Sequence, residues 1–184
     1  MAKLRAKDGA SARALEFAIL TAARTGEIIG AKWTEIDLSA KLWTIPAERM
    51  KAGKEHRVPL SDRAIAILKA LPRDGEYVFP GARKNKPLSN MAMLELVRGM
   101  RRGATVHGFR SSFRDWAAEM TAHPHEMCEI ALAHAVGNKV EAAYRRGDMM
   151  EKRRRLMADW AAYCAQTPAK MRDNIVSIGR RGRP

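Results

Sequence analysis

One long apolar stretch dominates the hydrophobic pattern near the start of the chain. Apolar residues fill "ARALEFAILTAAR" after Ser11, with few polar interruptions. Ser is favoured just before the first turn of a helix, and Gly commonly follows the last turn. The pattern therefore predicts a helix from about Ser11 to near Gly26. Because this helix is apolar almost all round, we expect it at the centre of the core.

The next segment has a different period. Three short runs of β-prone residues, near 32–37, 41–45 and 56–60, are separated by turn-prone stretches. Short runs rich in β-branched and aromatic residues, bounded by turns, are typical of strands. They predict a small antiparallel meander.

Helical spacing returns after the third of these runs. Ser61 is the predicted N-cap of a helix in "DRAIAILKAL", and Ser89 of one in "NMAMLELVRGMRR". Later helices are predicted from near His107, at 125–134, at 139–146, and from about 148 to 165.

The last predicted helix shows a clear inward face. Leu156, Trp160 and either Tyr163 or Cys164 recur in it at helical spacing. With the strand signals confined to 32–60, the predicted fold class is α+β and mostly α: a helical domain with a small three-stranded antiparallel sheet.

Composition sets the size of the domain and the kind of partner. With 184 residues, 46% of them hydrophobic, the chain can bury one core and is too short for two full domains. Its 34 Lys and Arg against 20 Asp and Glu give a formal net charge of +14, which attracts polyanions. Nucleic acid is therefore the first partner to test, and an anionic membrane surface is the competitor.

The hydropathy pattern argues against a membrane protein. No apolar run approaches the roughly 20 residues of a spanning helix, and no signal peptide opens the chain. We therefore expect no membrane association and a cytoplasmic protein. The two cysteines, Cys128 and Cys164, are too few for a disulfide framework, so we expect free thiols.

Seven polar residues are candidates for chemistry: Arg24, Glu27, Lys51, His107, Arg110, His134 and Tyr144. Each also has an ordinary structural explanation, such as an ion pair at a helix end or a solvated lysine in a Gly-containing turn. Taken together, two arginines, two histidines and a lysine without clustered carboxylates describe a phosphodiester site that uses no metal. A tyrosine hydroxyl is then the natural nucleophile.

His107 and Arg110 stand three residues apart at the predicted start of a helix. Free backbone N–H groups and the helix dipole favour an anion there. This pair is therefore expected to form one wall of a phosphate pocket.

The order of these residues and the sequences around them resemble the catalytic domain of the tyrosine recombinases, or phage-type integrases. The resemblance is greatest to the integrases of prophages and genomic islands. The matching stretches are "TAARTGEIIGAKW", "MKAGKEHRVPLS", "VHGFRSSF" and "LAHAVGNKVEAAYRRGD". There are two departures from the family pattern. Ala22 and Ala23 stand where relatives often have Gly and another residue, and Ala133 precedes His134 where Gly is common.

The resemblance implies a role for each candidate residue. Tyr144 attacks a DNA phosphodiester to give a 3′-phosphotyrosine and a free 5′-hydroxyl, with neither ATP nor a metal required. Arg24 and Arg110 clamp the phosphate, and Lys51 protonates the departing 5′-oxygen. The supporting roles fall to three residues: His107 helps accept the tyrosine proton, His134 hydrogen-bonds the phosphate, and Glu27 holds the Arg24 side of the pocket.

The resemblance also implies a domain organisation. Residues 1–165 are the expected catalytic domain and 166–184 a basic tail. Recombinases of this type usually carry amino-terminal DNA-binding domains, for which this chain has no room. The expected function is site-specific integration or excision of a prophage or genomic island. The expected partners are double-stranded DNA, further copies in a tetramer on that DNA, and accessory DNA-bending or excision factors.

Two alternatives remain at this point. The first is a DNA-binding module without chemistry, in which the basic surface only contacts phosphates. The second is a metal-dependent nuclease, which is disfavoured because no Asp and Glu cluster accompanies the histidines.

Overall fold

The computed structural model describes residues 1–83, 85–134 and 147–166. Two predicted features, the helix at 139–146 with Tyr144 and the basic tail beyond Gln166, lie outside the described residues.

The amino-terminal third is built around one buried helix. Helix α1 spans Ala2–Arg5, α2 spans Ala10–Thr21 and α3 spans Thr25–Ile29. Nine of the twelve residues of α2 are buried, which confirms its central place. The predicted start near Ser11 is confirmed to within one residue, although Gly9 and not Ser11 precedes the helix. The predicted end near Gly26 is wrong, because the chain turns into a left-handed conformation at Ala22 (φ 50°) and α3 begins separately at Thr25.

The predicted sheet is confirmed. Strands β1 (Ile36–Asp37), β2 (Leu42–Ile45) and β3 (His56–Pro59) pair in the order β1-β2-β3, and both pairings are antiparallel. Two short 3₁₀ turns, Trp33–Glu35 and Ala47–Arg49, flank β1 and β2. Alternate residues of β2 point into the core, where Trp43 and Ile45 are fully buried.

Two helices follow the sheet. Helix α4 spans Asp62–Ala70, and the Ser61 hydroxyl accepts from the Ala64 N–H at 3.4 Å, so this predicted cap is confirmed. Helix α5 spans Ala92–Met100 and begins after Met91. The predicted cap at Ser89 is wrong, because Ser89 lies in the preceding turn, where its carbonyl accepts from the Ala92 N–H.

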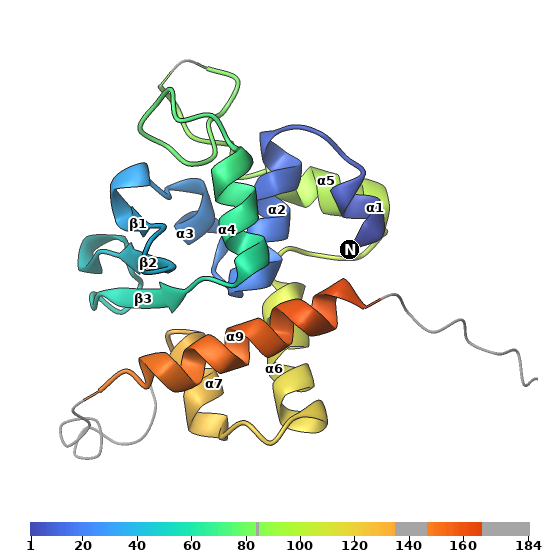
Figure 1. The fold of residues 1–184 in the computed structure, drawn as a ribbon. Coiled ribbons are helices and arrows are strands. Elements are labelled where there is room, and N and C mark those ends of the chain that lie inside the picture. The colour runs from blue at the N-terminus through green and yellow to red at the C-terminus, as the bar shows by residue number, and fades with distance from the viewer. Residues whose placement is uncertain (84, 135–146, 167–184) are drawn as a thin grey trace, which may run out of the picture.

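The carboxy-terminal part is helical as predicted. It contains α6 (Gly108–Met120), α7 (His125–Ala131) and α9 (Met150–Ala165). In Figure 1, α9 crosses between α6 and α7 below and the sheet and α2 above. Leu156 and Trp160 of α9 are buried, and the Trp160 indole N–H donates to the Ile19 carbonyl of α2 at 2.7 Å. Helix α9 therefore joins the carboxy-terminal helices to the amino-terminal part that contains α2 and the sheet.

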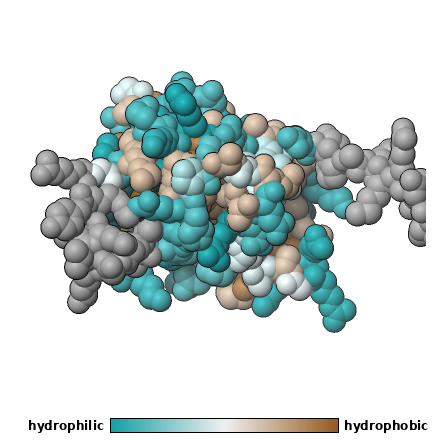
Figure 2. Space-filling model, turned by 90° about the horizontal axis from the view of Figure 1, so that it is seen from below, coloured by the Kyte–Doolittle hydropathy of each residue, from teal (hydrophilic) through white to brown (hydrophobic). Residues whose placement is uncertain are grey.

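The surface seen from below the view of Figure 1, on the side of α6 and α7, mixes hydrophilic residues with smaller apolar areas (Figure 2). Cys128 is buried and Cys164 half-buried, and both are free thiols as predicted. None of the helices in the described ranges combines the length and apolar character needed to cross a bilayer.

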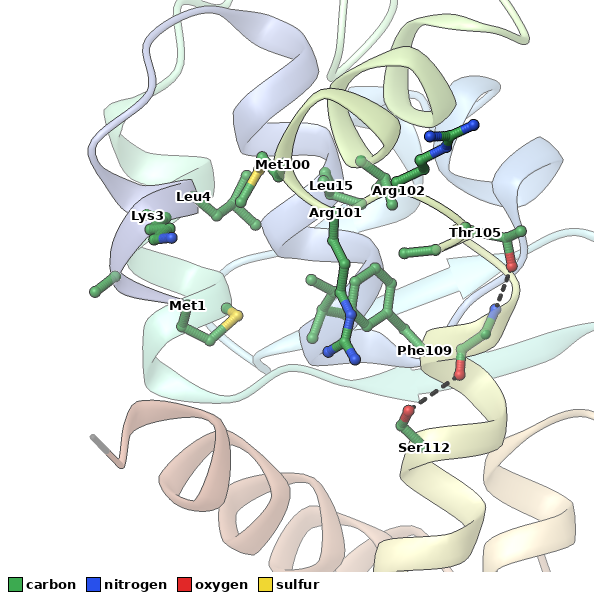
Figure 3. Close-up of a pocket in the computed structure, with 16 residues that line it drawn as sticks. Met1, Lys3, Leu4, Leu15, Met100, Arg101, Arg102, Thr105, Phe109 and Ser112 are labelled. Carbon is green, nitrogen blue, oxygen red and sulfur yellow. Dashed lines mark hydrogen bonds between the residues drawn. The ribbon is translucent and has the colours of Figure 1, made fainter. Parts of the chain in front are cut away.

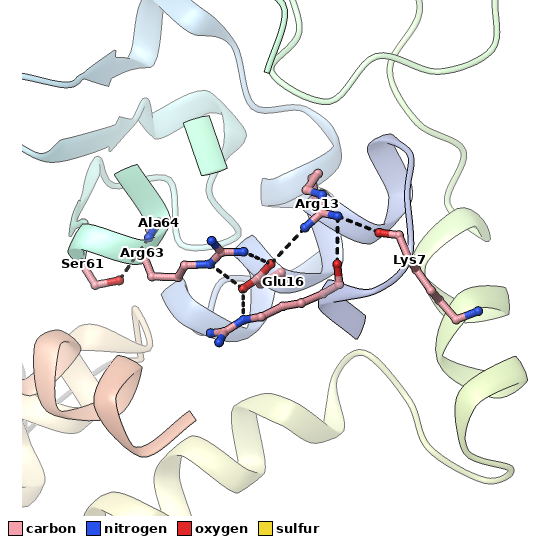
Figure 4. Close-up of polar contacts among 7 residues, drawn as sticks. Lys7, Arg13, Glu16, Ser61, Arg63 and Ala64 are labelled. Atoms are coloured by element: carbon pink, nitrogen blue, oxygen red, sulfur yellow. Dashed lines mark hydrogen bonds and ion pairs between the residues drawn. The ribbon is translucent and has the colours of Figure 1, made fainter. Parts of the chain in front are cut away.

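A buried carboxylate ties the first helices together. Glu16 of α2 is fully buried and accepts from Arg5 of α1 at 2.7 Å and from Arg63 of α4 at 2.8 and 2.9 Å (Figure 4). Arg13 lies 3.5 Å away and donates to the Lys7 carbonyl. Burial opposes ionisation of Glu16, but the hydrogen bonds from Arg63 and Arg5 outweigh it and lower the pKa of the carboxyl. Glu16 thus fastens α1 and α4 to the central helix.

Removal of this charge should destabilise the domain. We expect Glu16→Gln to lower the free energy of unfolding by roughly 2–4 kcal/mol, because the buried partner of the arginines loses its charge. Urea unfolding followed by circular dichroism measures the change. The matched control is Glu151→Gln, which removes an 85% exposed carboxylate paired with Arg154 and should cost less than about 0.5 kcal/mol. Equal losses in the two variants would contradict the proposed role of Glu16.

Candidate active site

A buried arginine lies at the centre of the site. Arg110 is in the first turn of α6 and only 5% exposed. Its Nη1 donates to the Ala22 carbonyl at the end of α2, and its Nη2 donates to the Leu132 carbonyl at the end of α7 at 2.7 Å. One guanidinium in α6 therefore joins the end of α2, which is distant in the sequence, to the end of α7. These bonds use two of its five N–H donors, so donors remain for an anion.

Both carbonyls belong to left-handed turns. Ala22 has φ 50° and Ala133 has φ 51°. After α7, the His134 N–H donates to the Glu129 carbonyl and the Ala133 N–H to the Ile130 carbonyl, which is the Schellman pattern of a helix end. Two of the three alanines that depart from the family pattern, Ala22 and Ala133, thus occupy backbone conformations that favour Gly.

Arg24 begins the short helix α3 and is held by its own turn. The Glu27 carboxylate accepts from the Arg24 backbone N–H at 2.8 Å and from Arg24 Nη1 at 2.8 Å. Glu27 is 5% exposed, whereas the Arg24 side chain is 27% exposed. The predicted ion pair is therefore present, and it keeps the Arg24 guanidinium at the edge of solvent.

The charges of the two arginines act on each other. Burial, followed by the positive charge of Arg24, lowers the pKa of Arg110 to about 10, while Glu27 and Glu129 oppose this shift. Arg110 remains charged at neutral pH. The site thus concentrates positive charge where little water screens it, and a bound anion would stabilise it.

His134 lies against the same guanidinium. Its Nε2 is 3.3 Å from Arg110 Nη2, and its Nδ1 is 2.7 Å from Glu129 Oε2. We call Arg24, Glu27, Arg110, Glu129 and His134 the arginine–histidine cluster. Three of the predicted catalytic residues and the predicted support Glu27 therefore come together.

Lys51 and His107 are placed less tightly. Lys51 is exposed in the turn between β2 and β3, and His107 is exposed at the residue that precedes α6. Among the described contacts, no side-chain hydrogen bond joins either residue to the arginine–histidine cluster. His107 and Arg110 share a helix start, but only the Arg110 side chain points into the core. The structure thus places Lys51 on the turn between β2 and β3 and His107 at the start of α6. Their roles in proton transfer remain predictions.

The comparisons with known proteins show the family of the chain. The model of the phage integrase family matches residues 2–151. The chain belongs to this family. The prophage integrase IntA of Escherichia coli strain K12 is 40% identical over 149 residues, which cover 78% of this chain and 36% of the relative. The chain therefore spans well under half the length of that relative.

Solved integrase structures share the fold. The integrase from mycobacterium phage Brujita matches with a TM-score of 0.68 and 19% identity over 92% of this chain and 57% of that one. A lambda integrase tetramer bound to a Holliday junction matches with a TM-score of 0.54 and 20% identity, covering 72% of this chain and 43% of that one. At these identities the likeness shows the fold alone, and it confirms the predicted fold class.

The segment that carries Tyr144 lies outside the described residues, but both of its flanks are described. His134 belongs to the arginine–histidine cluster. Beyond the segment, Asp148 pairs with Arg57 of β3 at 3.3 Å, and the buried Arg153 of α9 donates to the Arg57 carbonyl. The integrase chain thus returns to the sheet directly after this segment.

Three residues near the site were missed by sequence reasoning: Arg49, His56 and Glu129. Arg49 donates to the Glu27 carbonyl at 2.6 Å and pairs with Glu35, so it fastens α3 to the segment that leads to Lys51. A Cβ at Gly30 would lie 2.8 Å from Arg49 Nη2, which explains a glycine there. Arg49 begins the stretch "RMK" and Gly30 begins "GAKW". Neither stretch indicates that the two residues lie close together.

His56 of β3 lies between the sheet and the cluster. Burial, followed by the positive charge of Arg153, lowers the pKa of His56 to about 4, although a hydrogen bond to the Ala131 backbone and the charge of Glu27 oppose the shift. His56 is therefore neutral at physiological pH, and it connects β3 to the end of α7.

The low pKa of His56 predicts acid sensitivity. The usual pKa of 6.5 holds in the unfolded chain, so between pH 6.5 and about 4 the unfolded state binds the proton first and stability falls. We expect this group to remove about 1–3 kcal/mol over that window. Urea unfolding at several pH values should show that the free energy of unfolding of His56→Gln falls less steeply with decreasing pH than that of wild type. His125→Gln, at a 67% exposed histidine, should keep the wild-type slope; a slope unchanged by His56→Gln would contradict the assignment.

The two left-handed alanines give a second prediction. Because L residues are strained at positive φ, Ala22→Gly and Ala133→Gly should each raise the free energy of unfolding by about 0.5–1 kcal/mol. Ala66→Gly, at an exposed position inside α4, should instead lower it by about 1 kcal/mol. Thermal and urea unfolding of the three variants test this. Loss of stability in all three would mean that these turns are not left-handed in solution.

A groove elsewhere on the domain is separate from this site. It encloses about 940 Å³ between α1, α2, α5 and the start of α6, and its lining includes Leu4, Leu15, Phe109, Arg101 and Arg102 (Figure 3). Its lining includes no residue of the arginine–histidine cluster and neither Lys51 nor His107. This hollow is therefore distinct from the arginine–histidine cluster.

Proposed function

We propose that this chain is the catalytic domain of a site-specific DNA recombinase that cleaves and rejoins DNA through a covalent bond to Tyr144. Membership of the phage integrase family supports the class of reaction. The arginine–histidine cluster supports the binding of a phosphodiester. The observation that carries the proposal is the buried guanidinium of Arg110, held beside Arg24 and His134 with donors left for an anion.

The chemistry follows from where charge develops. As the Tyr144 oxygen attacks phosphorus, negative charge grows on the non-bridging oxygens, which Arg24 and Arg110 are placed to stabilise. The guanidiniums are fixed before the reaction, by Glu27 in one case and by two carbonyls in the other. Little reorganisation is then needed in the transition state.

The proton transfers fall to the more exposed residues. Formation of the phosphorus–oxygen bond to Tyr144 breaks the bond to the 5′-oxygen, which leaves with a proton from Lys51. His107 helps accept the tyrosine proton. A 5′-hydroxyl later attacks the 3′-phosphotyrosine and restores both the DNA backbone and the Tyr144 hydroxyl, so the sequence of steps requires neither ATP nor a metal.

The partners proposed are double-stranded DNA and further copies of the protein. The net charge of +14 favours DNA, and a lambda integrase tetramer bound to a Holliday junction shares this fold. Because the chain spans 36% of IntA, integration and excision of a prophage or genomic island in the bacterial cytoplasm are proposed for the whole protein. Accessory DNA-bending or excision factors are proposed for that whole protein too.

Covalent capture tests the function against the alternative of a DNA-binding module without chemistry. The substrate is a nicked duplex that carries the attachment-site core of the integrated element, so that the cleaved end diffuses away. We expect wild type to form a protein–DNA adduct that survives denaturing electrophoresis. Tyr144→Phe should form none, because no hydroxyl is available. A wild-type protein that binds the duplex without any adduct would favour the binding module.

The same assay separates Lys51 from Tyr144. Lys51→Ala should slow cleavage by roughly 10²–10⁴-fold, because the 5′-oxygen must leave without a proton. A substrate with sulfur in place of this bridging oxygen should rescue Lys51→Ala and leave Tyr144→Phe inactive, since a thiolate needs no proton to leave. Lys54→Ala, an exposed lysine of the same turn, is the matched control and should cleave as wild type does. Rescue of neither variant would remove Lys51 from its proposed role.

A further inference from the structure

Glu129 is the residue of the cluster that the proposed chemistry does not yet use. It lies in the last turn of α7, and its side chain is 13% exposed. One carboxylate oxygen is 2.7 Å from His134 Nδ1, and the other is 2.7 Å from Arg114 Nε of α6. His125 Nε2 is 3.8 Å from the same oxygen as Arg114. The carboxylate is therefore restrained on both sides.

The contacts of His134 determine which ring nitrogen carries the proton. A guanidinium has only donors, so Arg110 Nη2 donates and His134 Nε2 accepts across their 3.3 Å contact. The proton of the neutral imidazole is then on Nδ1, which donates to Glu129. Arg110 and Glu129 together fix one tautomer and one orientation of the ring.

This tautomer has a consequence for phosphate binding. An unprotonated Nε2 cannot donate to an anionic oxygen, so His134 needs a second proton to hydrogen-bond the phosphate. That proton would add positive charge beside Arg110, whose side chain is already buried near Arg24. The Glu129 carboxylate, in direct contact with Nδ1, is the group placed to balance this charge.

We propose that Glu129 is a positioning residue that fixes His134 with a proton on Nδ1 and, as phosphate binds, supports a second proton on Nε2 that is donated to the phosphate. The second proton comes from solvent and binds the lone pair of Nε2, and no bond between heavy atoms changes. The inference rests on the proposed function, since it assigns a partner to the phosphate-binding histidine. Arg114 holds the other oxygen of Glu129 and is expected to assist only indirectly.

The tautomer can be measured without any DNA. In the uniformly ¹⁵N-labelled chain, long-range ¹H–¹⁵N correlations of the histidine rings distinguish protonated Nδ1 from protonated Nε2, and His134→Gln identifies the His134 signals. We expect protonated Nδ1 in wild type and in Glu129→Gln, whose amide oxygen can still accept. Glu129→Met removes the acceptor at similar length, so it should shift the ring toward the Nε2-protonated tautomer. Backbone spectra check that each variant is folded.

Covalent capture measures the consequence for the reaction. We expect Glu129→Met to slow adduct formation by about 10-fold to 100-fold, the usual cost of losing a partner that orients a functional histidine. Glu129→Gln should recover part of this loss, because it restores the acceptor without the charge. Two controls are matched to these variants. Glu119→Met changes an exposed carboxylate of α6. Arg114→Met removes the ion pair at the Glu129 oxygen that does not contact His134. Both variants should stay within about threefold of wild type.

The outcomes separate this inference from the proposed function. The inference is overturned if His134 keeps its proton on Nδ1 in Glu129→Met. It is also overturned if this variant loses that tautomer and still cleaves DNA at the wild-type rate. A loss in Arg114→Met as large as in Glu129→Met also overturns it, because the effect would then be structural. If wild type forms no adduct, the proposed function fails, and the role of Glu129 in the reaction fails with it. The ring spectra then decide only whether Glu129 sets the tautomer.

Discussion

The site depends on the burial of one guanidinium. A charged side chain taken out of water is costly unless its donors find partners, and Arg110 finds them in two backbone carbonyls. Those carbonyls, of Ala22 and Leu132, end helices α2 and α7. The same bonds that lower the cost of burial therefore hold the two turns together. Because Arg24 follows one turn and His134 follows the other, the placement of both depends on Arg110.

Carboxylates complete the cluster from its two sides. Glu27 holds Arg24 through both its backbone and its side chain, while Glu129 holds His134. Each acid is more buried than the basic residue it orients. In each of these two pairs the carboxylate therefore lies deeper in the protein, and Arg24 and His134 lie nearer the solvent. Local attraction for a phosphate thus has a more specific origin than the net charge of the chain.

Much of the fold could be predicted from the sequence because local patterns encode it. The hydrophobic period and the turn residues predicted the sheet and most helices, and the order of motifs singled out Arg24, Arg110 and His134, which the structure brings together. The sequence did not reveal that α2 ends at Ala22, since alanine favours helix and only the bonded carbonyl explains the left-handed turn. Contacts of Arg49, His56 and Glu129 were missed for a related reason. Arg49 and His56 join segments whose proximity arises only from tertiary packing. Glu129 reaches His134, five residues later, only because the chain turns into a left-handed conformation at Ala133.

The described residues also divide by how tightly they are held. Arg24, Arg110 and His134, which are proposed to bind the phosphate, are fixed by partners within the domain. Lys51 and His107, which are proposed to move protons, are exposed on a turn and at a helix start. Electrostatic stabilisation is most effective when the groups are already in place, whereas proton transfer needs contact only at the moment a bond breaks. Under the proposed function, this division would let phosphate binding occur first, with cleavage dependent on the later approach of the exposed groups.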